Sequence, residues 1–265
     1  MRIIEPHIHT FSRTTDDYDH MMRAGIEAVI EPAFWLGSDR QYPESFLDYF
    51  HHITTFEVER AKKYGIRHFS MIAINPKEAN NLKVAHAVID RMEEYVNRPM
   101  VVGIGEIGLD QITDAEEEIF VRQLRYAEER KLPVLIHTPH QNKKVGTERI
   151  VKIIEREKVT QERIIIDHNN EETMPIAWRT KCWVGLTIYP ITKLSPERAI
   201  AIVRQYGIGR LLVNGAADWG HSDPLMIPLT AHKMLQEGFT RDQVDQLVFK
   251  NPAAFFSQSK NFALQ

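Results

Sequence analysis

Histidine and carboxylate side chains recur in this chain shortly after apolar segments. A pair with one residue between them, His7 and His9, follows Ile3-Ile4 near the start. Four further residues of these types, each following an apolar run, are Glu106, His137, His168 and Asp218. Four imidazoles and two carboxylates form a donor set that suits a pair of divalent cations. The pattern therefore predicts a metal centre built from five separate segments.

The elements that would carry these residues alternate regularly along the chain. Short apolar runs typical of buried parallel strands lie at 3–8, 28–32, 68–74, 101–106, 134–137, 164–168, 184–189 and 211–214. Charged segments with apolar residues at three- and four-residue steps lie at 45–64, 81–96, 114–130, 147–158, 195–206 and 224–238. A last segment of this kind, 240–256, follows the eighth strand. The alternation predicts eight strand–helix units in succession.

Eight such units predict an α/β fold, the (β/α)8 TIM barrel, as a single domain over 1–265 with an extra C-terminal helix covering one end. A parallel barrel brings the carboxyl ends of its strands to one face, so distant donors can meet there. The alternative is an open doubly wound sheet. Its phosphate-binding loop would have to be the glycine-rich segment 103–108, where Glu106 would point a carboxylate at a phosphate. The barrel is therefore the better prediction.

The position of each donor indicates how it could act. Side chains two apart on a strand point to the same side, as His7 and His9 would. A carboxylate at the end of an apolar run, such as Glu106, is costly to bury unless it is paired or coordinates a cation. Asp218 is well placed to act as general base and then general acid. The alternatives are incidental histidines, a surface Glu106 in a loop, and Asp218 as a helix N-cap.

Composition excludes some classes of function. The chain has 33 basic and 36 acidic residues, a formal net charge of −3, so it has no overall attraction to nucleic acid or anionic lipid. We see neither an apolar run long enough to span a bilayer nor a secretory signal, and we expect a cytoplasmic protein without a membrane partner. The single cysteine, Cys182, excludes an intrachain disulfide, and we expect a buried thiol there.

Several pieces of the sequence together resemble a known family. They are Pro6-His7-Ile8-His9, Gly105-Glu106-Ile107-Gly108-Leu109-Asp110, Leu132-Pro133-Val134-Leu135-Ile136-His137, Asp167-His168, Asp218 and the closing Lys250-Asn251-Pro252-Ala253-Ala254-Phe255-Phe256. The set resembles the TatD-like metal-dependent hydrolases of the amidohydrolase superfamily over essentially the full length. The resemblance implies a barrel of the metallo-dependent hydrolase type. It also implies that His7, His9, Glu106 and Asp218 hold one metal, and Glu106, His137 and His168 the second.

The chain departs from this family where the substrate would bind. After His168 it has Asn169-Asn170-Glu171-Glu172, an acidic segment poorly suited to a polyanion. The end of the eighth strand is Ala216-Ala217-Asp218-Trp219-Gly220, where the family usually has Glu-Thr-Asp. We therefore expect the metal machinery to be shared and the substrate to differ, with nucleic acid not favoured and a small molecule preferred.

Polar and aromatic residues after the strands are candidates for contacting that substrate. They are Glu31, Trp35, His140, Tyr189 and Lys193, with Lys143, Asn169 and His221 nearby in the sequence. Lys193 or Lys143 could bind a phosphate as a point charge. Each could instead be an ordinary solvated loop residue.

These observations predict a divalent-metal-dependent hydrolase that uses a metal-bound hydroxide on an ester-type bond, first of all a phosphoester. Asp218 would take and return the proton. Two ions are expected, zinc from the imidazole-rich donor set, with manganese or magnesium as alternatives. The rival functions are hydrolysis of a lactone, amide or carboxylic ester, a TatD-like deoxyribonuclease, and a non-catalytic barrel that binds a small molecule or partner. The sequence leaves the oligomeric state open.

Overall fold

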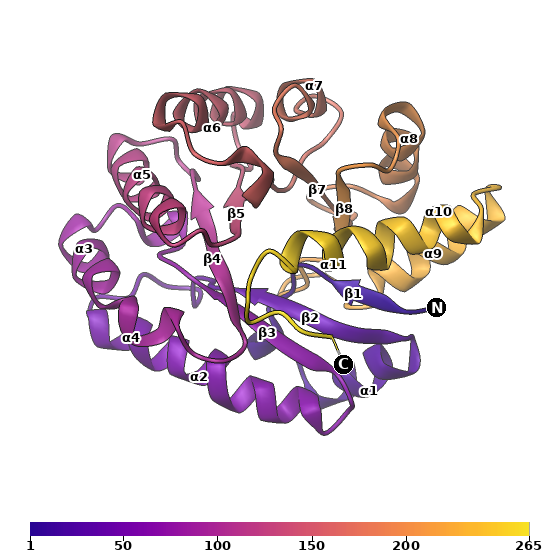
Figure 1. The fold of residues 1–265 in the computed structure, drawn as a ribbon, viewed down its shortest axis with the longest axis horizontal. Helices are drawn as coiled ribbons and strands as arrows, with labels where there is room; N and C mark the ends of the chain where they lie inside the picture. Colours follow the sequence, from indigo (N-terminus) through magenta and orange to yellow (C-terminus); the bar gives the residue numbers. More distant parts are fainter. Residues whose placement is uncertain (265) are drawn as a thin grey trace.

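Eight parallel strands, in the order β1 to β8, form a nearly closed barrel in the computed structural model, which describes residues 1–264 (Figure 1). The strands are β1 (Ile3–Glu5), β2 (Ile26–Pro32), β3 (Arg67–Ile72), β4 (Val101–Gly108), β5 (Val134–His137), β6 (Ile164–Ile166), β7 (Trp183–Thr187) and β8 (Leu211–Asn214). Each strand pairs in parallel with the next. The predicted (β/α)8 barrel is confirmed, whereas the single domain over 1–265 stays a prediction.

The last strand meets the first just beyond their carboxyl ends. The backbone N–H of Ala216 donates to the carbonyl of His7 at 2.8 Å, and the N–H of His9 donates to the carbonyl of Ala217 at 2.9 Å. These two bonds place the segment after β8 directly beside the histidine pair after β1. Residues from the two ends of the barrel sequence therefore share one face.

Helices surround the barrel between successive strands (Figure 1). They are α1 (Thr15–Arg23), α2 (Pro43–Lys62), α3 (Leu82–Arg91), α4 (Glu93–Val96), α5 (Asp114–Glu129), α6 (Lys143–Glu157), α7 (Met174–Trp178), α8 (Pro196–Tyr206) and α9 (Met226–Gln236). The sequence pattern did not predict α1 or α7. Helix α1 buries only Tyr18 and Met21, and α7 has five residues, so neither carries a long apolar stripe. None of the helices described is long and apolar enough to cross a bilayer.

A C-terminal helical segment closes the amino end of the barrel. It consists of α10 (Arg241–Asp245), the π-helical segment η4 (Gln246–Lys250) and α11 (Asn251–Phe256), and it crosses the barrel in Figure 1. The buried rings of Phe255 and Phe256 join the cluster that fills the barrel interior. Asn251 donates through Nδ2 to the carbonyl of Leu211, the first residue of β8, at 2.7 Å. The predicted additional helix is therefore present and covers the end opposite the strands' carboxyl termini.

Cys182 lies just before β7 and its side chain is fully buried. Burial raises the pKa of its thiol to about 12. A thiol with such a pKa is almost entirely protonated at neutral pH and is a poor nucleophile. The prediction of a buried thiol is confirmed.

Replacing Phe256 by alanine tests whether the C-terminal segment stabilises the barrel. Phe256 is 0% exposed, and its loss would leave a cavity against the barrel interior. We expect Phe256→Ala to lower the free energy of unfolding by about 3–5 kcal/mol, measured by urea denaturation. The control is Phe56→Ala on α2, whose ring is 54% exposed. Equal effects of the two substitutions would show that α11 is not packed as described.

Candidate metal centre

Five of the six predicted metal ligands converge at the carboxyl face of the barrel, around Glu106 on β4. Its Oε1 lies 3.0 Å from Nε2 of His168 and 3.1 Å from Nδ1 of His137. The same oxygen lies 3.6 Å from Nε2 of His7, which itself lies 3.1 Å from Nε2 of His9. His7, Glu106 and His168 form a group of ligand atoms all within 4.8 Å of one another. The four imidazoles and Glu106 are all buried.

The strand ends position these donors. His7 and His9 follow β1, Glu106 lies in β4, His137 is the last residue of β5, and His168 follows β6. Because all the strands run parallel, each of these positions falls at the same face. The amide of Asn75, after β3, completes the surroundings of Glu106, with Nδ2 donating to Oε2 at 3.0 Å.

Most of these groups are in the protonation state that a metal ligand requires. Burial lowers the pKa of His9 and His168 well below the ordinary value, which leaves both imidazoles neutral at pH 7. Burial alone would raise the pKa of Glu106. The charges and hydrogen bonds of His7, His137 and His168 outweigh it and hold that pKa well below the ordinary value. Glu106 is therefore an ionised carboxylate among basic nitrogens.

Unpartnered ring nitrogens indicate that the donor set fits a cation. Nδ1 of His9 and Nε2 of His137 are buried, and neither has a hydrogen-bond partner among the described residues. A buried polar atom without a partner is costly. Imidazoles grouped around one carboxylate form the donor set of zinc and related divalent ions. The residues present therefore fit a metal centre.

Two buried groups orient the histidines from behind. Asp167, after β6, accepts a hydrogen bond from Nδ1 of His7 at 2.6 Å, and the hydroxyl of Thr187 lies 2.6 Å from Nδ1 of His168. Both bonds leave the Nε2 nitrogens facing Glu106. Burial alone would raise the pKa of Asp167, but His168 and His7 hold it well below the ordinary value. A carboxylate behind a ligating histidine fixes its tautomer and increases its basicity.

Gly185 on β7 allows Asp167 to take this position. A Cβ atom at Gly185 would overlap the Asp167 carboxylate, with the backbone Cα of that residue only 3.1 Å away. Asp167 also accepts from Nδ2 of Asn214 at 2.9 Å and from the backbone N–H of His168 at 2.7 Å. It is thus held from several sides.

Asp218 directly follows Ala217, whose carbonyl accepts from the N–H of His9, but its carboxylate takes partners outside the other five predicted ligands. Oδ1 accepts from the hydroxyl of Tyr189 at 3.1 Å and from the backbone N–H of Gly220 at 2.7 Å. Its backbone carbonyl accepts from Nη1 of Arg13 at 2.6 Å. Asp218 is half-buried at the mouth, whereas the other five predicted ligands are buried.

The predicted substrate-binding residues fall into two groups. Glu31 is fully buried, and its carboxylate accepts from the backbone N–H of Phe11 and lies 2.7 Å from Nε2 of His68. Its oxygens are already bonded inside the protein, which is a structural arrangement. The other four lie around the barrel mouth. Trp35 contacts Trp219, His140 contacts His137, Tyr189 bonds to Asp218, and Lys193 lies near the acidic groups of the centre.

The basic groups at the mouth have lowered pKa values. Lys193 is half-buried, with Nζ 5.2 Å from the ring centroid of Tyr189. Burial lowers the pKa of its ammonium, while Glu106, Asp167 and Asp218 act in the opposite direction. Burial lowers the pKa of His140 to about 4 and that of Lys143 to about 8. Lys143 donates to the carbonyl of His168 at 3.0 Å, so it supports this loop.

A polar cavity of about 510 Å³ adjoins the centre. It is lined by Lys77, Asp110, Gln111, Ile112, His140, Gln141 and Asn142, which follow β3, β4 and β5. Oδ1 of Asp110 lies 3.9 Å from Nε2 of His137, which connects the cavity to the metal ligands. The cavity has room for a small molecule next to the centre.

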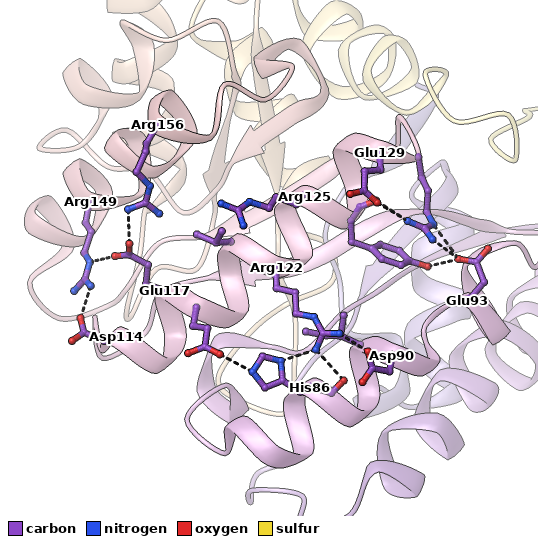
Figure 2. A pocket seen from close by; sticks show the side chains of 15 residues that line it. His86, Asp90, Glu93, Asp114, Glu117, Arg122, Arg125, Glu129, Arg149 and Arg156 are labelled. Atoms are coloured by element: carbon purple, nitrogen blue, oxygen red, sulfur yellow. Dashed lines mark hydrogen bonds and ion pairs between the residues drawn. The ribbon is translucent and has the colours of Figure 1, made fainter.

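A larger groove, of about 900 Å³, lies outside the barrel along α3, α5 and α6 (Figure 2). Its charged side chains mostly pair with one another. Arg149 contacts Glu117 at 2.6 Å and Asp114 at 2.8 Å, and His86 lies 2.7 Å from Glu118. Exposed pairs of this kind contribute little individually. The groove is a surface ion-pair network, and the chemistry belongs to the barrel mouth.

Comparison with known proteins agrees with this geometry. The family model described as TatD related DNase matches residues 5–257. An uncharacterized metal-dependent hydrolase of Methanocaldococcus jannaschii is 30% identical over 256 residues, which cover 96% of this chain and 99% of that protein. The crystal structure of a TatD-like protein from Archaeoglobus fulgidus has a TM-score of 0.80 and 25% identity, covering 96% of this chain and 99% of that one.

A more distant structural neighbour shares the fold alone. A mutant organophosphorus hydrolase from Deinococcus radiodurans has a TM-score of 0.68 and 17% identity, covering 96% of this chain and 92% of that one. The fold and these relatives define a metal-dependent hydrolase, and such enzymes use divalent metal ions. The chain belongs to the TatD related DNase family.

Replacing Asp167 by asparagine tests its role behind His7. The amide can no longer accept from His7 as a charged group, so the imidazole becomes a weaker ligand. We expect Asp167→Asn to remain folded and to bind divalent metal about 10–100-fold more weakly, measured by competition with a chromophoric chelator. The control is Asp39→Asn, an exposed loop carboxylate. Unchanged metal affinity in Asp167→Asn would reject this role.

Proposed function

We propose that this metal-dependent hydrolase holds two divalent cations and hydrolyses phosphoesters. The observation that carries the proposal is the buried, ionised carboxylate of Glu106 within hydrogen-bond reach of two imidazoles and near a third. Cations bound there would supply Lewis-acid chemistry, polarising an ester oxygen and acidifying water. Zinc is the expected ion from the imidazole donors, with manganese or magnesium as alternatives.

The proposed ligands divide into two sets that share Glu106. His7, His9, Glu106 and Asp218 would hold one ion, and Glu106, His137 and His168 the other. The support for a shared carboxylate is that His7 approaches Glu106 from the β1 side while His137 and His168 approach it from the β5 and β6 side. Asp167 and Thr187 keep His7 and His168 oriented toward it.

Asp218 is the proposed general base and, later in the reaction, general acid. Its half-buried position lets it exchange a proton with a substrate or with water at the mouth. The hydroxyl of Tyr189 and the N–H of Gly220 hold its carboxylate in place. Arg13 donates a hydrogen bond to the backbone carbonyl of Asp218, and this contact also restricts where its side chain can lie.

Positive groups at the mouth favour a phosphoester over an uncharged ester. Lys193 lies near the acidic groups of the centre, and Lys77 lines the adjoining cavity. An ammonium can bind a phosphate oxygen as a point charge. Hydrolysis of a lactone, amide or carboxylic ester is the alternative, and it does not use these charges.

A deoxyribonuclease remains the second candidate, because the family model carries that description. The acidic segment after His168 opposes a polyanion less than the sequence suggests. Glu171 forms an ion pair with Arg198 at 2.6 Å, which offsets its charge. Metal-dependent cleavage of single-stranded DNA, at a rate comparable with that of small phosphoesters, would favour this candidate.

Metal content tests the proposed centre directly. We expect about two divalent ions per chain, by plasma mass spectrometry of untagged protein purified without chelators, and none or a small fraction in His7→Ala/His9→Ala. The control is His51→Ala/His52→Ala, which removes two histidines on α2 far in sequence from the centre. If the protein binds no metal after incubation with zinc and manganese, the metal centre is wrong and a non-catalytic barrel becomes the better explanation.

Substitution of Asp218 tests the mechanism, and a panel of esters tests the substrate class. We expect Asp218→Asn to keep the fold, measured by circular dichroism, and to lose about 100-fold or more in kcat, since general acid–base catalysis contributes on this order. The panel comprises 4-nitrophenyl phosphate, bis(4-nitrophenyl) phosphate, a lactone and 4-nitrophenyl acetate. Full activity in Asp218→Asn would remove it from the mechanism, and turnover of the lactone alone would exclude a phosphoesterase.

A further inference from the structure

Three aromatic rings form a continuous surface at one side of the barrel mouth. They belong to Phe34 and Trp35, after β2, and to Trp219, after β8. The ring centroids of Phe34 and Trp219 are 5.1 Å apart, and those of Trp35 and Trp219 are 5.7 Å apart in an edge-to-face arrangement. We call Phe34, Trp35 and Trp219 the aromatic platform.

The aromatic platform contacts one predicted metal ligand and is adjacent in the chain to another. The ring of Phe34 stacks on the imidazole of His9, with centroids 3.8 Å apart and planes inclined by 16°. Trp219 directly follows Asp218, the proposed general base. If the ester bond of a substrate lies at the metal centre, the substituent next to that bond would lie against these rings.

Two of the three rings reach solvent although they are large and apolar, whereas Phe34 is only 8% exposed. Trp219 is 45% exposed, and Trp35 is partly exposed. Apolar surface left in contact with water is unfavourable, and a cluster of such rings next to a catalytic centre is a common form of binding surface. Tyrosine and tryptophan also combine a flat apolar ring with a polar edge, which suits a ligand that is partly wet.

The loop that carries Trp35 is held rigidly. Arg40 is buried and forms an ion pair with Glu78, and its Nη2 donates to the carbonyl of Phe34 at 2.9 Å. Gly37 lies in the left-handed region, with φ of 87°, close under Trp219. A side chain there would be strained and would meet the indole ring at 3.8 Å. The rings are thus pre-positioned, which lowers the entropic penalty of binding.

One cationic group lies over a ring of the platform. Nζ of Lys77 lies 5.2 Å from the ring centroid of Trp35 and 3.3 Å from Oδ1 of Asp110. Lys77 also lines the polar cavity next to His137. The aromatic platform therefore adjoins a cationic group that also lines the polar cavity.

We propose that the aromatic platform stacks a planar aromatic or heterocyclic group of the substrate, so that the enzyme prefers phosphoesters carrying such a group. The inference rests on the proposed phosphoester function and adds the chemistry of the group next to the phosphorus. Stacking on tryptophan favours any flat π-system and discriminates against an alkyl group of equal size, which lacks the flat face. A nucleobase and a simple aryl ring share this property.

Calorimetric binding of three phosphonates to the metal-loaded enzyme tests the inference without turnover, because their C–P bond is not an ester. We expect phenylphosphonate to bind about tenfold more tightly than methylphosphonate, and also more tightly than cyclohexylphosphonate. Trp35→Leu and Trp219→Leu should each reduce this preference severalfold and leave methylphosphonate binding unchanged. Thymidine 5′-phosphonate compared with phenylphosphonate separates a nucleobase site from a general aryl site.

The control variant is Trp178→Leu, which removes an indole on α7 that packs against Tyr206. It should keep the full preference for phenylphosphonate. Equal binding of phenyl-, methyl- and cyclohexylphosphonate, with phosphoester turnover retained, would reject the stacking role of the aromatic platform but not the proposed phosphoester function. Failure to bind any of them, together with no phosphoester turnover, would reject the proposed function as well. A dimer that Trp219→Leu dissociates, with no ligand preference, would assign the platform to a second copy of the chain and overturn the inference.

Discussion

The burial of one negative charge is the constraint on which the rest of this structure depends. Glu106 is 1% exposed, and an ionised carboxylate in such a place is stable only with several compensating partners. Those partners come from β1, β3, β5 and β6, so the strand ends have to be placed to within hydrogen-bonding distance of one another. The same constraint explains three residues behind the histidines. Asp167 and Thr187 orient His7 and His168 toward Glu106, and Gly185 leaves room for the Asp167 carboxylate.

The two ends of the barrel differ in composition. The amino end is packed with apolar side chains, and the carboxyl end carries the predicted metal ligands. At the amino end, Phe255 and Phe256 close the interior with apolar contacts, and Asn251 bonds to the carbonyl of Leu211. At the carboxyl end polar side chains gather, one ring nitrogen each of His9 and His137 lacks a partner among the described residues, and a cavity adjoins His137. A polar end of this kind is tolerated because the opposite end is packed.

Much of the fold could be predicted because each strand contains a short, mostly apolar run, and helical segments separate most of these runs. Residues such as Glu106 and His137 stood out for the same reason, since polar groups are unusual directly after such runs. The position of a residue in the sequence does not reveal where its side chain points, however. Glu31 lies near the end of β2 and Trp35 follows that strand, yet Glu31 bonds to Phe11 and His68 inside the protein while Trp35 reaches the mouth. The pairing of Asp167 with His7, 160 residues apart, was equally hidden. It depends on the closure of the barrel, which no local pattern contains.

The join between β8 and β1 also constrains how the protein is made. The histidine pair leaves the ribosome first, and its neighbours Ala216 and Ala217 leave it after most of the chain has been synthesised. During that interval β1 has only one of its two strand neighbours, and no growing chain can assemble the complete centre. Contacts between such distant residues form slowly. We therefore expect metal to enter a finished or nearly finished barrel, and the nascent chain to have exposed histidines that bind metal only weakly.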